Sequence, residues 1–250
     1  MSAQKPDVRR RAWFLSLARR YVRRRLRNGF DGLYVHGIEP IRRLAQTRPV
    51  VLAANHVCWW DAFVVVMLDE ALGTESYCLM DADNLRQMPF FGWIGAVPLD
   101  RSSLRQGLRD LRASATLLDQ PGRALWIFPQ GEHRPPHLRP LQLKRGVEML
   151  VRGREVDVVP VAINYVWRQA PQPTIAVSFG APLTGAAGAA LLGVLDEALV
   201  TGLSRIDRFT LSADEAGFSP LIAPRGEGRV PLGAKLLAAF KDRQATEAAR

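Results

Sequence analysis

The middle of the chain alternates short apolar runs with segments in which apolar residues recur every three or four positions. The first pattern is typical of buried strands and the second of helices with one buried face. The predicted strands are Val50–Ala53, Ser76–Met80, Ala96–Leu99, Ala124–Phe128, Val156–Ile163 and Thr174–Phe179. The predicted helices are residues 9–27, Trp60–Leu72, Leu104–Leu118, Arg145–Val151 and Gly185–Leu203. This alternation predicts an α/β fold with a central mixed sheet flanked by helices, preceded by an N-terminal basic amphipathic helix.

The first predicted helix, residues 9–27, carries apolar residues on one side and arginines on the other. The apolar positions follow helical spacing and are Trp13, Phe14, Leu17, Ala18, Tyr21, Val22 and Leu26. A basic amphipathic helix with aromatic residues is typical of segments that lie in the interface of an anionic membrane. The alternative is a helix that packs on the body of the protein and exposes its basic face to water.

Most of the net charge of +10 lies in the same segment. Residues 1–30 contain ten basic residues and one acidic residue, whereas the remaining 220 contain 24 basic and 23 acidic residues. A nearly neutral body argues against a nucleic-acid partner. Neither a signal-peptide pattern nor a span of about 20 apolar residues occurs. We therefore expect peripheral association of residues 9–27 with the cytoplasmic face of the cell membrane.

The length of 250 residues fits a single hydrophobic core. We divide the chain into the basic helix (1–30), a central domain (31–206) and a C-terminal extension (207–250) packed on that domain. Prolines and glycines interrupt the extension, and we expect a short helix near Leu232–Asp242. The two cysteines do not form a disulfide framework, which indicates a reducing compartment.

Four segments carry candidate chemistry, and each lies at or beside a predicted strand. They are Asn55-His56-x4-Asp61, Phe90–Arg101, Ile127-Phe128-Pro129-Gln130-Gly131 and Val159–Ile163. A neutral imidazole accepts a proton from a hydroxyl near neutral pH, and a carboxylate on its other nitrogen fixes the tautomer. His56 and Asp61 are therefore candidates for a general base and the group that orients it.

In this order and at this spacing the four segments resemble the blocks of the glycerophospholipid acyltransferase family, of the lysophosphatidate-acyltransferase type. The resemblance covers about Val50 to Leu183. It implies an O-acyltransferase domain that moves a fatty acyl group from a thioester, acyl-coenzyme A or acyl carrier protein, to a hydroxyl of a lipid acceptor. It also implies catalytic roles for His56 and Asp61 and binding of acceptor phosphate by Arg101.

The third segment departs from the family, whose members with phosphatidate-type acceptors usually read Phe-Pro-Glu-Gly-Thr-Arg. Here Gln130 replaces the acid, and Glu132 and His133 follow Gly131 where the threonine and arginine are expected. A glutamate repels a phosphate, although Arg134, Arg139 and Lys144 offer replacement cations. We expect Gln130, Gly131 and Arg134 to contact substrate. The acceptor is lysophosphatidate, another lysolipid, or a glycolipid or other hydroxylated lipid without phosphate.

Other classes of function find less support. His133 and His137 flank two prolines, which prevents the helix of a His-Glu-x2-His zinc site. No Gly-x-Ser-x-Gly elbow or Gly-x-Gly-x2-Gly loop occurs, so a serine hydrolase and a nucleotide cofactor are not indicated. We expect neither a metal nor a cofactor. A non-catalytic lipid-binding protein that kept the fold is the remaining alternative.

Overall fold

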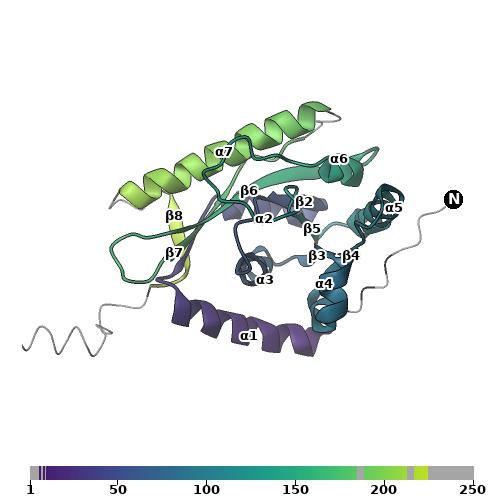
Figure 1. The fold of residues 1–250 in the computed structure, drawn as a ribbon. Helices are drawn as coiled ribbons and strands as arrows, with labels where there is room; N and C mark the ends of the chain where they lie inside the picture. Colours follow the sequence, from purple (N-terminus) through teal and green to yellow (C-terminus); the bar gives the residue numbers. More distant parts are fainter. Residues whose placement is uncertain (1–5, 7, 9, 185–188, 213–216, 225–250) are drawn as a thin grey trace, which may run out of the picture.

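The computed structural model describes residues 6, 8, 10–184, 189–212 and 217–224. Within them, an eight-stranded mixed sheet has helices on both faces, which confirms the predicted α/β fold (Figure 1). The strands are β1 (Leu33–His36), β2 (Val50–Ala54), β3 (Glu75–Asp81), β4 (Ala96–Leu99), β5 (Arg123–Ile127), β6 (Asp157–Val166), β7 (Thr174–Phe179) and β8 (Phe218–Ile222). The helices are α1 (Ala12–Gly29), α2 (Ile38–Thr47), α3 (Asp61–Leu72), α4 (Ala82–Gln87), α5 (Leu104–Ala115), α6 (Gly146–Val151) and α7 (Ala189–Leu211), with the 3-10 helices η1 (Pro89–Ile94) and η2 (Thr116–Leu118).

The order of the strands brings several strand ends together. The sheet reads β4-β3-β5-β2-β6-β7-β1-β8, and its first five strands run parallel to one another. β7 is antiparallel to β6, β1 is parallel to β7, and β8 is antiparallel to β1. The carboxyl ends of β2, β3, β4 and β5 therefore meet at one edge of the sheet, where ligands bind in open α/β folds.

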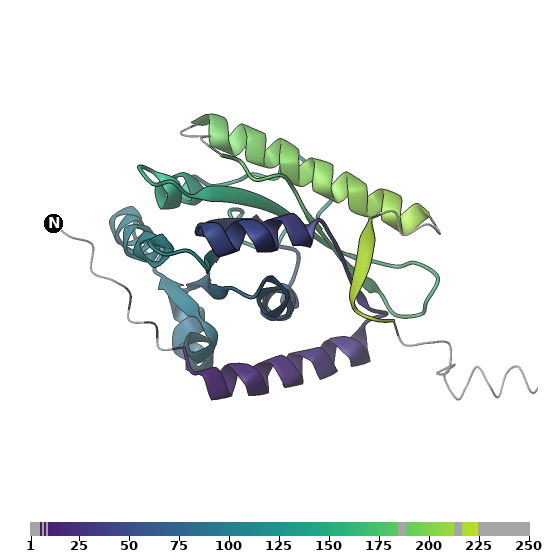
Figure 2. The same cartoon turned by 180° about the vertical axis from the view of Figure 1, so that it is seen from behind.

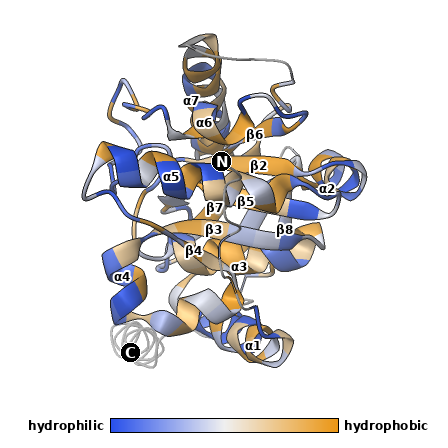
Figure 3. Cartoon of the chain, turned by 90° about the vertical axis from the view of Figure 1, so that its right-hand side faces the viewer, coloured by the Kyte–Doolittle hydropathy of each residue, from blue (hydrophilic) through white to orange (hydrophobic). Residues whose placement is uncertain are grey.

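Helices cover the two faces of the sheet in separate groups (Figures 1 and 2). Val50 and Leu52 of β2 pack in a core with residues of α1, α2 and α3, whereas Val51 and Ala53 pack in a second core with residues of α5, α6 and α7. Burial on both faces explains why β2 is a continuous apolar run instead of an alternating one. Figure 3 shows that central strands such as β2 and β6 are mostly hydrophobic, whereas helices such as α4 and α5 contain hydrophilic stretches.

Five elements are absent from the sequence prediction: β1, α2, α4, η1 and β8. β8 falls within the predicted extension 207–250 and pairs with β1 at the edge of the sheet. The described part of α7 runs to Leu211, eight residues beyond its predicted end at Leu203. Residues 185–188 and the predicted helix Leu232–Asp242 lie outside the described residues.

The predicted apolar face of the N-terminal helix is divided in two. Val22 and Leu26 of α1 are buried in the core shared with α3. Trp13, Leu17 and Tyr21 are more than half exposed and form a stripe along the outside of the helix, one turn apart. Within the described residues, no helix combines the length and the apolar character needed to cross a bilayer.

The arginines of α1 are divided in the same way. Arg19 contacts Asp69 of α3 at 3.0 Å, and Arg23 contacts Glu70 at 2.6 Å. These ion pairs attach α1 to the body of the protein. Arg20 and Arg24 are exposed and have no ion pair within the part of the chain that the structure describes.

The packing of α7 on β6 predicts opposite effects at two glycines of that helix. A methyl group at Gly202 would lie 2.7 Å from Cβ of Ala162, which is too short a side chain to move away, whereas Gly193 has open space around it. Gly202→Ala is expected to lower the free energy of unfolding by about 1–3 kcal/mol. Gly193→Ala is expected to raise it by roughly 0.5–1 kcal/mol, because alanine favours the helix. Urea unfolding measures both, and equal effects at the two positions would contradict the close packing at Gly202.

Candidate active site

The four sequence segments meet at the carboxyl edge of the parallel strands. His56 follows β2, Arg101 follows β4, and Gln130 and Gly131 follow β5. β6 is longer than its neighbour β2, so its last residues, including Tyr165, extend beyond the end of β2. The topology thus explains why segments about 30 residues apart in the sequence form one site.

Asp61 is the fully buried centre of this site and the first residue of α3. Its Oδ2 accepts hydrogen bonds from the backbone N–H groups of Val57 (2.7 Å) and Cys58 (3.1 Å). Its Oδ1 accepts a hydrogen bond from the Tyr165 hydroxyl at 2.7 Å. Burial and the charge of Asp61 raise the pKa of Tyr165, which therefore keeps its proton. The N-terminus of a helix adds favourable partial charge, so this environment stabilises a buried carboxylate.

His56 makes the fourth contact to Asp61, with Nδ1 2.7 Å from Oδ2. A carboxylate only accepts hydrogen bonds, so Nδ1 carries the proton and Nε2 keeps its lone pair. The imidazole ring stacks on Phe128, with the ring centroids 4.2 Å apart. His56 retains 23% of its side-chain exposure, so the ring is accessible while Asp61 is not. This pair has the orientation that a general base requires.

Gln130 and Asn55 hold the backbone at the amino-terminal side of His56. Gln130 is buried, and its Oε1 accepts a hydrogen bond from the His56 N–H at 2.7 Å while its Nε2 donates to the Leu141 carbonyl at 3.1 Å. Asn55 bonds to both the N–H (2.7 Å) and the carbonyl (2.9 Å) of Ile163 on β6. Both ends of the Gln130 amide are used inside the protein. We therefore assign Gln130 to positioning His56 instead of the substrate contact expected from the sequence.

An apolar pocket of about 500 Å³ opens beside His56. Its lining comes from α3, β3, η1 and β5, with Leu15 of α1 also contributing. The apolar residues along it include Val65, Val66, Leu79, Met80, Phe91 and Ile94. A volume of this size is typical of sites for small molecules, and an apolar lining favours a hydrocarbon ligand.

Two cations converge at Gly131, at the mouth of this pocket. Arg101 donates from Nη1 to the Gly131 carbonyl at 2.6 Å and from Nη2 to Asp81 at 2.8 Å. Lys144 is exposed. A methyl group added at Gly131 would lie 3.0 Å from Nζ of Lys144 and 3.2 Å from Nη1 of Arg101. Lys144 has no ion pair within the described ranges. One acidic partner for two cations leaves a positive site suited to an anion.

Arg134 follows Gly131 in the same loop and does not line the pocket. Its backbone N–H donates to the His56 carbonyl at 2.8 Å, and its guanidinium pairs with Glu132 at 3.1 Å. Arg134 therefore neutralises the glutamate that was expected to repel a phosphate. These contacts give Arg134 a positioning role, whereas the third sequence segment predicts that it touches substrate.

Two other reactive side chains near His56 are uncharged. Burial raises the pKa of the Cys58 thiol, so Cys58 is not a thiolate nucleophile at neutral pH. The ring of His133 lies 4.1 Å from that of His56, and burial together with His56 lowers the pKa of His133. Within the part of the chain that the structure describes, no three His, Cys, Asp or Glu side chains gather to bind a metal.

A family model described as Acyltransferase matches residues 32–164, which is more than half of the chain. The chain belongs to the Acyltransferase family. This confirms the family predicted from the four segments, all of which lie in the matched region. No curated protein matches the sequence.

Among solved structures, the fold is similar to that of the 1-acyl-sn-glycerophosphate (LPA) acyltransferase PlsC from Thermotoga maritima. The TM-score is 0.58 at 18% sequence identity, and the match covers 77% of this chain and 79% of the other. At this identity the likeness concerns the fold. The site residues of the present chain are therefore assigned from its own geometry.

The role of Tyr165 in the site has almost no signal in the sequence. Tyr165 lies 104 positions after Asp61, and no motif spacing connects them. The only signal is a tyrosine two residues after the fourth segment, since a tyrosine near the end of a buried strand needs a partner for its hydroxyl.

Gln130→Glu, which introduces the residue usual in the family, tests the positioning role. The buried carboxylate cannot donate to the Leu141 carbonyl, so the variant is expected to lose about 1–3 kcal/mol of stability at pH 7. The loss should shrink as the pH falls toward 4, because the protonated carboxyl donates again. Urea unfolding at both pH values measures this change. Gln46→Glu, at an exposed position on α2, is the control and should change stability by less than about 0.5 kcal/mol.

Proposed function

We propose that this acyltransferase moves a fatty acyl group from a thioester donor to a hydroxyl of a lipid acceptor, with His56 as general base and Asp61 orienting it. The observation that carries the proposal is the His56–Asp61 pair, at 2.7 Å, beside the mouth of an apolar pocket of about 500 Å³. The pocket suits a hydrocarbon chain, and the free Nε2 suits a proton acceptor. The donor is acyl-coenzyme A or acyl carrier protein, and no cofactor takes part.

In the proposed reaction the acceptor hydroxyl donates a hydrogen bond to Nε2 of His56. Its oxygen attacks the thioester carbonyl carbon as the proton moves to the imidazole, and Asp61 stabilises the imidazolium. The C–S bond then breaks, and the leaving thiolate takes the proton from Nε2. This route needs no nucleophile from the protein, which agrees with the protonated state of the Cys58 thiol.

The favoured acceptor is lysophosphatidate or another lysolipid that carries a phosphate. Arg101 and Lys144 converge at Gly131, and Asp81 balances only one of their charges. Glu132 is paired with Arg134, so it does not oppose an anion at this place. Gly131 contributes by lacking a side chain, since a methyl group there would fill the space between the two cations.

A glycolipid or other acceptor without phosphate is the second candidate. It is favoured by His133, which stands beside His56 and is neutral because burial lowers its pKa. A neutral imidazole is a hydrogen-bonding partner for a sugar hydroxyl, whereas the family's usual arginine suits phosphate.

Replacing His56 tests the mechanism and the acceptor together. His56→Ala is expected to lower kcat by about 100- to 10,000-fold, the range for loss of a general base. The measurement is transfer from one radiolabelled acyl thioester to lysophosphatidate, other lysolipids and glycolipids. His137→Ala, at an exposed loop position, is the matched control and should keep full activity. Full acyl transfer by His56→Ala would overturn the catalytic assignment.

We also propose that α1 attaches the protein to the cytoplasmic face of the cell membrane. The stripe of Trp13, Leu17 and Tyr21 is exposed on its outer side. The ring of Phe63 contacts both Tyr21 and Trp59, with ring centroids 6.0 Å and 4.8 Å apart, respectively. Trp59 is 52% exposed and also lines the apolar pocket. The apolar surface therefore continues from α1 to the pocket, and free arginines beside it suit anionic lipids.

Substituting the exposed stripe tests membrane attachment without disturbing the core. Trp13, Leu17 and Tyr21 changed together to Ala should weaken binding to anionic vesicles on the order of 100-fold, about 3 kcal/mol of lost apolar contact. Deletion of α1 is unsuitable because Val22 and Leu26 are buried. In the control variant, Trp167 and Leu211, which are exposed and lie outside α1, are changed to Ala. This variant should bind vesicles normally. Equal vesicle sedimentation by all three proteins would rule out the stripe.

A further inference from the structure

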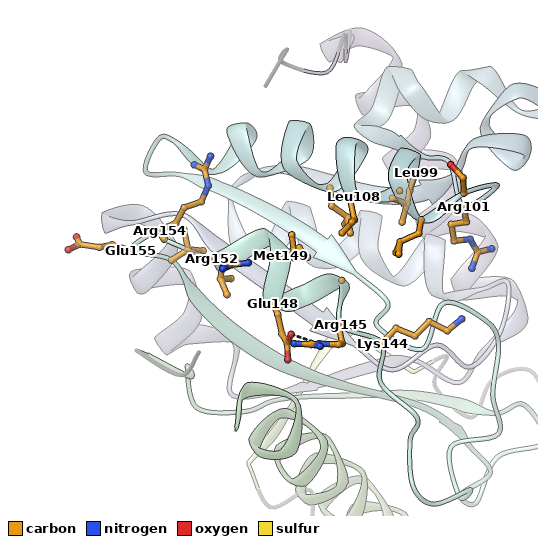
Figure 4. A pocket seen from close by; sticks show the side chains of 18 residues that line it. Leu99, Arg101, Leu108, Lys144, Arg145, Glu148, Met149, Arg152, Arg154 and Glu155 are labelled. Carbon is orange, nitrogen blue, oxygen red and sulfur yellow. Dashed lines mark hydrogen bonds and ion pairs between the residues drawn. The ribbon is translucent and has the colours of Figure 1, made fainter. Parts of the chain in front are cut away.

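A second and larger groove lies between α5 and α6, outside the pocket beside His56. Its volume is about 1140 Å³. Figure 4 shows Leu108 from the α5 side and Met149 from α6 pointing into it, with Arg101 and Lys144 at one end and Arg152 and Arg154 at the other. The floor is apolar and the rim is mostly basic, so the groove suits a ligand with both an apolar or neutral chain and anionic groups.

The groove meets the active site at Arg101, which lines both the groove and the apolar pocket. Lys144 also lines the groove, and its Nζ reaches Gly131 at the mouth of the pocket. A single extended molecule can therefore lie in both cavities, with its middle beside His56. An acyl thioester has this shape, since its hydrocarbon chain and its thiol-bearing part leave the carbonyl carbon in opposite directions.

The groove lies on the face of the sheet opposite α1 (Figures 1 and 2). The proposed membrane surface is on the α1 face, so the groove is open to water. A water-soluble ligand fits this position better than the chain of a lipid acceptor.

The charges of the groove favour an anion. The lining contains five basic residues and two acidic ones. The buried acid, Glu148, is paired with Arg145 at 2.8 Å, and the other, Glu155, is exposed. Arg154 is paired with Asp119. Arg152 is exposed at the end away from Arg101 and has no ion pair within the described residues. Arg152 is therefore available for a phosphate.

We infer that the α5–α6 groove binds the coenzyme A part of the acyl donor, which identifies the donor of the proposed function as acyl-coenzyme A. The pantetheine chain lies on the apolar floor, with its sulfur at the Arg101 end. The phosphates lie at the Arg152 end, and the acyl chain enters the pocket beside His56. A concave site of this volume suits a coenzyme-sized molecule, whereas docking of a folded carrier protein needs a broad outer surface.

Binding of free coenzyme A to the full-length protein tests this site without depending on catalysis. Calorimetric titration is expected to give a Kd about tenfold weaker for Arg152→Ala than for the unaltered protein, the effect of losing one charge-assisted hydrogen bond. Met149→Trp, which fills the groove from α6, should weaken binding further. Arg43→Ala removes an exposed arginine from α2 on the opposite face and should leave the Kd unchanged. Thermal unfolding verifies that each variant is folded.

Kinetics with two donors of the same acyl chain give the second readout. Arg152→Ala should raise the KM for acyl-coenzyme A about tenfold and leave the KM for acyl-pantetheine, which lacks the phosphates, unchanged. An unaltered coenzyme A Kd in Arg152→Ala and Met149→Trp would overturn the inference, as would transfer from acyl carrier protein only. If coenzyme A binds in the groove but no thioester supports transfer, the proposed function fails while the binding site stands.

Discussion

The buried carboxylate of Asp61 is the constraint on which the site depends. An uncompensated charge at full burial is costly, and here four hydrogen bonds from two parts of the chain compensate it. The loop after β2 supplies two N–H groups and His56, and β6 supplies the Tyr165 hydroxyl. Because these donors must all reach one carboxyl group, the start of α3, the loop and the end of β6 are fixed relative to one another. The orientation of the His56 ring is a consequence of that requirement.

The central strands and the catalytic pair were predictable because their signals are local. β2, β4 and β7 are short apolar runs bounded by turn residues, and the structure begins each of them at its predicted first residue. His56 and Asp61 are five residues apart on a single strand-to-helix connection. The family resemblance joined the four segments in order, and the parallel topology explains their convergence, since all four lie at or beside strand ends on one edge of the sheet.

The remaining features depend on contacts that have no local signal. β8 is a short strand at the edge of the sheet, and its neighbour β1 is also short. Their residues pair across about 180 positions, as between His36 and Phe218. In the sequence, Gln130 is a replacement of the acid usual in a substrate-binding motif. Only its two hydrogen bonds, to the His56 N–H and the Leu141 carbonyl, indicate that it positions the base. The division of the α1 surface likewise depends on α3. Asp69 and Glu70 of α3 form ion pairs with arginines of α1, whereas the sequence alone predicts that those arginines face a membrane.

The position of His56 at the sheet edge has a consequence for how two unlike substrates reach one base. The edge is accessible from both faces of the sheet, and the cavities on the two faces share Arg101. In the proposed reaction a lipid approaches along the apolar surface that joins Tyr21, Phe63 and Trp59, while a water-soluble thioester approaches between α5 and α6. The sheet keeps these two environments apart, and the carbonyl carbon and the hydroxyl meet only at the histidine. A site on a helix face or within one layer would expose the base to one environment alone.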